Sequence, residues 1–177
     1  PRKDEVLFDS YNEFSGPDKT NSWGYFYIAN NKNGTAAYDP EKVIPMEWTP
    51  SPGDWADMWC GPGKWYCISV GGGQPSNLDG GQGWSVRRWT STIEGKYRIL
   101  AKAKASSQGD GVGYKVFIDG QEKFSKILKP KETADIDLMI DMKKGMRVDF
   151  IATPGPGVDA SYDTAGLRIQ VLTLPKQ

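Results

Sequence analysis

Alternation of apolar and polar residues with a period of two is the feature that most constrains the fold of this chain. In residues 96–105, tyrosine, isoleucine and alanine alternate with lysine and arginine. The same period recurs in residues 135–141, 145–152 and 166–174. Successive side chains of an extended strand point to opposite faces. Each segment therefore predicts a strand with one buried and one solvated face.

A hairpin and several shorter strands complete the predicted secondary structure. Residues 113–128 form two alternating runs joined by Asp119-Gly120, a dipeptide that tolerates positive φ in a tight turn. Further strands are expected at residues 5–9, 23–29, around 55–59, 65–70 and 84–90. Only residues 39–44 allow a helical turn. Many short strands with polar turns predict an all-β fold, an antiparallel β-sandwich of the jelly-roll type, with residues 1–177 as a single domain.

Composition excludes several classes of function. Lys plus Arg equals Asp plus Glu, at 22 each, which argues against a nucleic-acid or membrane-surface partner because both need concentrated basic charge. No run approaches the ~20 apolar residues that cross a bilayer. The chain has no histidine, so Ser-His-Asp and Cys-His enzymes and zinc hydrolases are excluded. Enzymes built from carboxylates, tyrosine, lysine or arginine stay open.

The two cysteines, Cys60 and Cys67, flank the turn-forming sequence Gly61-Pro62-Gly63. This turn folds the flanking segments back on each other, which predicts a disulfide. The alternative is two free buried thiols in a reducing compartment. A disulfide favours an oxidising compartment, and hence a secreted or cell-surface protein.

Tryptophan is concentrated in one half of the chain. All seven tryptophans lie between positions 23 and 89, in a region rich in glycine and proline, and none lies in the regular strands that follow. A sandwich core needs few of them, so we expect some rings to be exposed for stacking on sugar rings. The candidates are Trp55, Trp59, Trp65 and Trp84, together with Tyr25. The alternative is that these rings pack under the loops as a satellite core.

A second candidate region runs from Gly71-Gly72-Gly73 to the strand with Arg87 and Arg88. The glycines allow close backbone approach. Strand alternation places one arginine on each sheet face. The buried arginine must pair with a carboxylate, and the exposed one is available to a sugar hydroxyl or an anionic sugar. The sequence leaves open which is which, and also whether both form ordinary salt bridges.

Four segments in a fixed order resemble a known class of domain. They are VGGGQP, VRRWTS, GDGVGYKVFIDGQEKFS and GMRVDFIATPGPGVDASYDTAGLRIQV. Together they look like a non-catalytic carbohydrate-binding module of the β-sandwich type, found in secreted bacterial polysaccharide-degrading enzymes. Such modules often carry histidine after the glycines, where this chain has Gln74. The resemblance implies a monomeric module within a larger secreted enzyme, with Gln74 as a further candidate contact to the polysaccharide.

Modules of this architecture often hold a structural calcium ion between the first strand and the loop before the last. The corresponding segments here offer Asp9 and Glu13, and Asp159 and Asp163. Calcium takes six to eight oxygen ligands, which two carboxylates and loop carbonyls can supply. The alternative is that these aspartates cap turns.

The sequence thus predicts a protein that is not an enzyme and that binds a polysaccharide, which targets an attached enzyme to its substrate. One alternative is a small jelly-roll polysaccharide lyase, with Tyr25, Tyr27, Arg87 and Gln74 available, or a glycosidase using Asp54 and Asp57. Another alternative is an adhesive domain that contacts a neighbouring protein domain.

Overall fold

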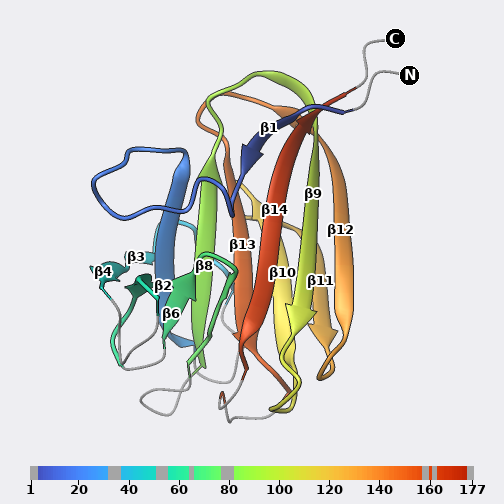
Figure 1. Cartoon of the computed structure of the whole chain (residues 1–177). Helices are drawn as coiled ribbons and strands as arrows, with labels where there is room; N and C mark the ends of the chain where they lie inside the picture. The colour runs from blue at the N-terminus through green and yellow to red at the C-terminus, as the bar shows by residue number, and fades with distance from the viewer. Residues whose placement is uncertain are drawn as a thin grey trace.

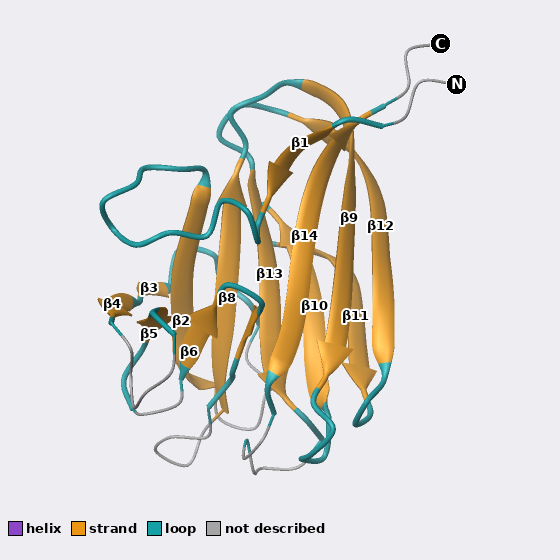
Figure 2. Ribbon diagram, viewed as in Figure 1, coloured by secondary structure: helices purple, strands orange, loops and turns teal. Residues whose placement is uncertain are grey.

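The computed structural model describes residues 4–31, 37–50, 56–63, 66–76, 82–156, 160 and 163–174. Within these ranges the chain is built from strands and turns, without a helix. No helix in the described part is long and apolar enough to cross a bilayer. Two antiparallel sheets pack against each other, which confirms the predicted β-sandwich (Figures 1 and 2).

The larger sheet has eight strands, in the order β12-β9-β14-β7-β6-β5-β4, with β1 paired to β14 beside β7. Its strands are β1 (Val6–Asp9), β4 (Glu47–Thr49), β5 (Met58–Cys60), β6 (Cys67–Ser69), β7 (Gly72–Gly73), β9 (Gly95–Ala105), β12 (Thr133–Met142) and β14 (Ala165–Thr173). The smaller sheet has six strands, in the order β11-β10-β13-β8-β2-β3. They are β2 (Trp23–Asn31), β3 (Ile44–Pro45), β8 (Gln82–Thr90), β10 (Val112–Ile118), β11 (Gln121–Leu128) and β13 (Arg147–Pro154).

The predicted local features are confirmed. The hairpin β10–β11 turns at Asp119 and Gly120, which both have positive φ (44° and 81°). Residues 39–42 form a turn closed by a hydrogen bond from the Lys42 amide to the Asp39 carbonyl. Cys60 and Cys67 form a disulfide that joins neighbouring positions of β5 and β6. Each feature depends on residues close together in the chain.

The core between the sheets is made by the inward faces of the alternating strands. On β9 and β14 these are small or branched residues, and on β2, β8 and β10 they include aromatic rings. Fully buried examples are Trp89, Ile99, Val148, Ile169 and Val171. The smaller sheet is also covered on its outer face, by a second cluster around Trp84, Val86, Phe117 and Ile151.

Three polar side chains tie the two sheets together through the core. The Tyr114 hydroxyl, from β10, lies within hydrogen-bond distance of the carbonyls of Lys104 and Gly166, at 3.0 and 2.8 Å. In the opposite direction, the Tyr66 hydroxyl lies 2.9 and 2.7 Å from the carbonyls of Ile28 and Trp84. Arg87, from β8, donates to carbonyls in the turn between β6 and β7. These bonds give the buried tyrosine hydroxyls and the Nη atoms of Arg87 their hydrogen-bond partners.

Candidate functional site

The described tryptophans are mostly core residues. Trp23, Trp84 and Trp89 are buried, and Trp48 and Trp59 are half-buried. Trp84 is 3% exposed, because Tyr38 and Val43 pack over the outer face of the sheet that carries it. The expectation that Trp84 presents an open ring to a ligand is therefore wrong, and the satellite-core alternative holds for it. Trp55 and Trp65 lie outside the described residues.

Arg87 and Arg88 point to opposite faces of β8, as predicted, but both are buried. Arg88 forms a bidentate ion pair with Asp149, in which Nε lies 2.6 Å from Oδ1 and Nη2 lies 3.0 Å from Oδ2. Arg87 has three backbone carbonyls as hydrogen-bond acceptors, and burial lowers the pKa of its guanidinium to about 10. Neither side chain is available to a ligand, so the expected contact between one arginine and a sugar is wrong.

The predicted calcium ligands are not brought together. In the β1–β14 register Asp9 lies opposite Gln170, seven positions after Asp163. β14 begins at Ala165, and the five strand residues from there to Gln170 span about 17 Å, which is far beyond the reach of one ion. Asp163 instead accepts a hydrogen bond from the Gly155 amide at 3.1 Å. The pairing of Asp9 with Asp163 around one cation is therefore wrong, and Asp159 lies outside the described residues.

Asp9 and Glu13 each accept hydrogen bonds from neighbouring side chains. Burial opposes ionisation of Asp9, but hydrogen bonds from Arg168 at 2.6 Å and Gln170 at 2.8 Å hold its pKa below the usual value. Glu13 accepts the indole N–H of Trp23 at 2.5 Å. No group of three or more acidic, histidine or cysteine side chains in the described ranges has the arrangement of a metal site.

Two of the predicted aromatic residues do meet, in a hollow of about 330 Å³ beside β2 and β5. Tyr25 and Trp59 stack with their ring centres 5.2 Å apart and their planes 15° apart. Trp48 meets Trp59 edge-on at 5.4 Å. Phe26 also lines the hollow, and its ring lies where a side chain at Gly24 would be. We call this site the Trp59 hollow.

Residues 15–17 and 19–21 form the other, polar wall of the Trp59 hollow. It is held by the Trp59 indole N–H, which donates to the Ser15 carbonyl at 2.9 Å. Asn21 Nδ2 donates to the Glu13 carbonyl at 2.7 Å and lies 3.0 Å from Ser15 Oγ. Lys19 and Thr20 are exposed on this wall and make no side-chain hydrogen bond or ion pair within the described residues. The wall is thus fixed in place, with free polar groups at its rim.

Tyr25 and Gln74 differ from expectation in their surroundings. Tyr25 is buried, with Trp59 on its face, Phe14 at its edge and the Arg87 guanidinium carbon 5.7 Å from its ring centre. Burial raises the pKa of the Tyr25 hydroxyl. Tyr25 therefore packs against Trp59 from the core side. The expectation of an exposed Tyr25 ring is wrong. Gln74 is half-buried beside β7 and is not among the residues that line the Trp59 hollow.

The polar wall was not among the site residues predicted from the sequence. Lys19, Thr20 and Asn21 form a polar run immediately before the aromatic strand β2, and that juxtaposition is the signal that could have identified them. Their approach to Trp59 depends on the hydrogen bond between residues 15 and 59, which are far apart in the chain.

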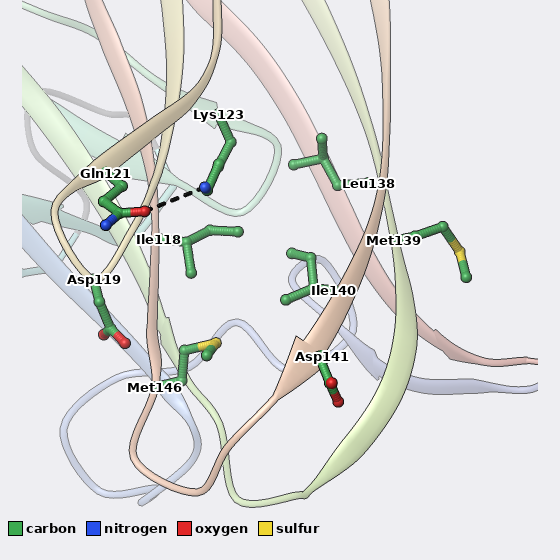
Figure 3. A pocket seen from close by; sticks show the side chains of 9 residues that line it. All are labelled: Ile118, Asp119, Gln121, Lys123, Leu138, Met139, Ile140, Asp141 and Met146. Carbon is green, nitrogen blue, oxygen red and sulfur yellow. Dashed lines mark hydrogen bonds between the residues drawn. The ribbon is translucent and has the colours of Figure 1, made fainter.

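A different hollow, of about 500 Å³, opens between the edge strands β11 and β12 (Figure 3). Its interior is apolar, where Ile118, Leu138, Ile140 and Met146 point toward one another. The rim carries Asp119, Gln121, Lys123 and Asp141. None of the described residues that line this edge hollow is aromatic, and the hollow lies between edge strands of the two sheets.

Comparison with known proteins gives no family for the chain. No protein-family model matches it, and no curated protein matches its sequence. Solved structures with a partial likeness include a PA14 sugar-binding domain from an RTX adhesin, at 12% identity and a TM-score of 0.36, covering 84% of this chain and 88% of that one. A β-glucosidase from Kluyveromyces marxianus matches at 10% identity and a TM-score of 0.41, over 92% of this chain and 18% of that one.

Murine APRIL matches at 9% identity and a TM-score of 0.36, over 86% of this chain and 99% of that one. The structural neighbours therefore include sugar-binding and glycosidase-related proteins beside a protein of another kind. Likenesses of this size carry no argument about ligand or activity, which must come from the site itself.

Proposed function

We propose that this chain is a non-catalytic domain that binds a saccharide in the Trp59 hollow. The observation that carries the proposal is the combination of the half-buried Trp59 ring with the free polar side chains of Lys19 and Thr20 in one depression. A sugar ring presents a face of C–H groups and a rim of hydroxyls. An aromatic ring complements the face, and polar side chains complement the rim.

The geometry around Trp59 supports a prepared site. Its ring is held by stacking on Tyr25, by edge contact with Trp48 and by the hydrogen bond to Ser15. A ring fixed in this way loses little conformational freedom when a ligand binds. The hollow is open and polar at its rim, which suits affinities in the micromolar to millimolar range.

The lining of the Trp59 hollow supports a binding role over catalysis. A glycosidase uses two carboxylates about 5 to 9.5 Å apart, and none of the described residues that line the hollow is acidic. A lyase built on Tyr25, Arg87 and Gln74 would need these groups at one surface. Tyr25 and Arg87 are buried instead, and Gln74 lies elsewhere. Asp54, one of the two candidate glycosidase residues, lies outside the described residues.

The adhesive alternative receives little support from the surface. The most exposed large apolar side chains are Ile127 and Met139, at 58% and 60%. Ile127 alternates with core residues of β11, and Met139 alternates with residues of β12 that pack on the core. The two side chains therefore lie on the outer faces of different sheets and do not form one patch.

The Cys60–Cys67 disulfide supports a secreted or cell-surface location, since disulfides persist in oxidising compartments. We therefore propose that the domain works outside the cytosol. Its place within a larger bacterial polysaccharide-degrading enzyme is proposed from the sequence resemblance alone.

Affinity electrophoresis through gels that contain neutral, uronic or sulfated polysaccharides tests the proposal. We expect at least one polysaccharide to retard the protein and Trp59→Ala to weaken the apparent affinity about tenfold, the equivalent of ~1.4 kcal/mol. The matched control is Tyr11→Ala, which removes an exposed ring outside the hollow.

A second variant keeps the test informative if Trp59→Ala disturbs folding. Lys19→Ala with Thr20→Ala removes only exposed rim groups, so we expect an unchanged melting temperature and weaker binding. Absence of retardation by every polysaccharide, or equal loss in the Tyr11 control, would refute the proposal.

A further inference from the structure

A third hollow, of about 540 Å³, lies at the end of the sandwich opposite the chain termini (Figure 1). It is formed where β9 ends and where β12 and β14 begin. Two lysines and three residues with hydroxyl groups give the hollow its polar lining, and a glycine completes the wall. They are Lys104, Lys131, Ser106, Ser107, Thr164 and Gly166. We call it the lysine hollow. No acidic side chain in the described part of the chain lines it.

Lys104 differs from the other charged residues of β9 in its neighbours. Lys102 lies between Asp135 and Arg168 on the adjacent strands, and Arg98 bonds Asp137 and Asp4. Lys104 instead lies between Thr133 and Gly166, which carry no charge.

Lys131 is held at the hollow by its backbone. Its φ of 68° is in the left-handed region, which residues other than glycine rarely occupy. Its amide donates to the Ser106 carbonyl at 2.8 Å, which fixes Lys131 against the segment after β9. Lys131 follows Pro130 in a turn closed by the Glu132 amide and the Lys129 carbonyl at 2.9 Å, and a positive φ at this position is typical of a type II turn.

The walls of the lysine hollow are cross-linked by backbone hydrogen bonds. The Ser106 amide donates to the Thr164 carbonyl, and the Ala105 amide donates to the Glu132 carbonyl, both at 3.0 Å. The Tyr114 hydroxyl ties the carbonyls of Lys104 and Gly166 from inside the core. The two lysines are therefore carried on a rigid frame.

The nearby carboxylate of Glu132 is already neutralised. It accepts a hydrogen bond from the Lys129 amide and pairs with the Lys126 ammonium, each at 2.9 Å. These contacts, led by Lys126, lower the pKa of Glu132. Within the described residues, neither Lys104 nor Lys131 makes a side-chain ion pair or hydrogen bond. Among the described residues, the hollow thus presents two ammonium groups without a paired carboxylate, beside three hydroxyls.

We propose that the lysine hollow binds an oxyanion, a carboxylate or a sulfate ester, carried on a saccharide. The ammonium groups complement the anion, and the hydroxyls of Ser106, Ser107 and Thr164 complement neighbouring ring hydroxyls. The inference that the ligand is an oxyanion depends on the two lysines. The inference that a saccharide carries the oxyanion rests on the proposed function. This site is separate from the Trp59 hollow, because β9 and β5 are four strands apart in the larger sheet, about 19 Å.

Lys104→Gln with Lys131→Gln tests this site, and Lys143→Gln with Lys144→Gln is the matched control. The control removes the same charge from exposed lysines that follow β12, at the other end of the sandwich. The probes are polygalacturonate for carboxylates, dextran sulfate for sulfates, and dextran as the neutral polymer. Affinity electrophoresis gives the apparent dissociation constants, and circular dichroism confirms that each variant is folded.

We expect at least one of the two charged polymers to bind the unmodified chain more tightly than dextran. Lys104→Gln with Lys131→Gln should weaken that binding about tenfold, and the control pair should leave it within a factor of two. Raising the salt from 0.05 to 0.3 M should weaken it further, because added ions screen exposed charges. Equal weakening of binding by the two double variants, or no preference for charged polymers over dextran, would overturn the proposal.

Two further arms separate this site from the proposed function. If Trp59→Ala leaves neutral binding unchanged while the Lys104 and Lys131 variant loses anionic binding, the oxyanion site stands and the role of the Trp59 hollow fails. If single-stranded DNA binds as tightly as the anionic polysaccharides and is lost in the same variant, the assignment to a saccharide is overturned.

Discussion

At the scale of single residues, a buried cluster of three polar groups lies on the outer face of the smaller sheet. Asp149 is fully buried and pairs with Arg88, and Tyr38 donates its hydroxyl hydrogen to the same carboxylate. Burial and the neighbouring Asp149 charge raise the pKa of Tyr38. The Pro40 carbonyl accepts a further hydrogen bond from Arg88 at 3.0 Å. This cluster fastens residues 38–40 over the sheet.

Asp149→Asn should therefore destabilise the fold strongly. The change leaves the Arg88 charge buried without a counter-ion, which costs about 3–5 kcal/mol. The midpoint of urea unfolding measures this effect. Asp137→Asn is the control, since Asp137 pairs with Arg98 at an exposed position and its loss should matter little. Equal destabilisation by the two variants would contradict the importance of the buried pair.

At the scale of elements, the triple glycine joins two parts of the larger sheet. Gly72 and Gly73 of β7 pair with Gly166 and Ala165 of β14. A Cβ at Gly72 would overlap the Ala165 carbonyl, whereas one at Gly71 would meet nothing within 4 Å. The close approach expected from these glycines is confirmed, and it belongs to Gly72 in particular.

The adjacent positions give a matched pair of variants. Gly72→Ala should lower the free energy of unfolding by about 2–3 kcal/mol, because overpacking against backbone forces β7 away from β14. Gly71→Ala should be neutral or slightly stabilising, since it restricts only the unfolded chain. Thermal unfolding of both variants measures the difference. Similar melting temperatures for the two would show that β7 tolerates displacement.

At the scale of the whole molecule, buried tyrosines make the contact between the sheets sensitive to alkali. Burial raises the pKa values of Tyr66 and Tyr114 above the ordinary value of 10.0. Above pH 10 the unfolded chain therefore loses these protons while the folded chain keeps them, so stability must fall as pH rises. Arg87 acts in the opposite direction above its pKa of about 10. As one group, it does not offset the tyrosines.

The free energy of unfolding should therefore decrease from pH 9 to pH 11. Tyr66→Phe with Tyr114→Phe should lower stability at pH 8, because the hydrogen bond of each buried hydroxyl to a backbone carbonyl is lost. The same variant should show a shallower decrease at higher pH. Urea titrations at four pH values measure both effects, and Tyr11→Phe, at an exposed ring, is the control. An unchanged slope in the double variant would contradict this account.

How much the sequence could predict depended on how local each signal was. Alternation along β9 and β14 predicted which side chains face the core, because the period of two follows from strand geometry alone. The turn at Asp119-Gly120 and the bond between Cys60 and Cys67 were equally accessible, because each joins residues that are close in the chain. The candidate site was predictable only in part. Trp59 and Tyr25 were both predicted to belong to it, but Tyr25 packs against Trp59 and does not face the ligand.

The sequence by itself therefore determined the longer strands, their faces and the sandwich class, but not the short strands β3, β4 and β7. Tertiary structure alone decided which outward-facing residues are exposed. Trp84 and Arg88 lie on the outer face of a sheet, yet both are buried because the segment containing Tyr38 and Val43 folds over them. Lys104 lies on a comparable outer face and stays uncovered. Burial of an outer face depends on contacts between distant segments, and alternation within one strand carries no information about them.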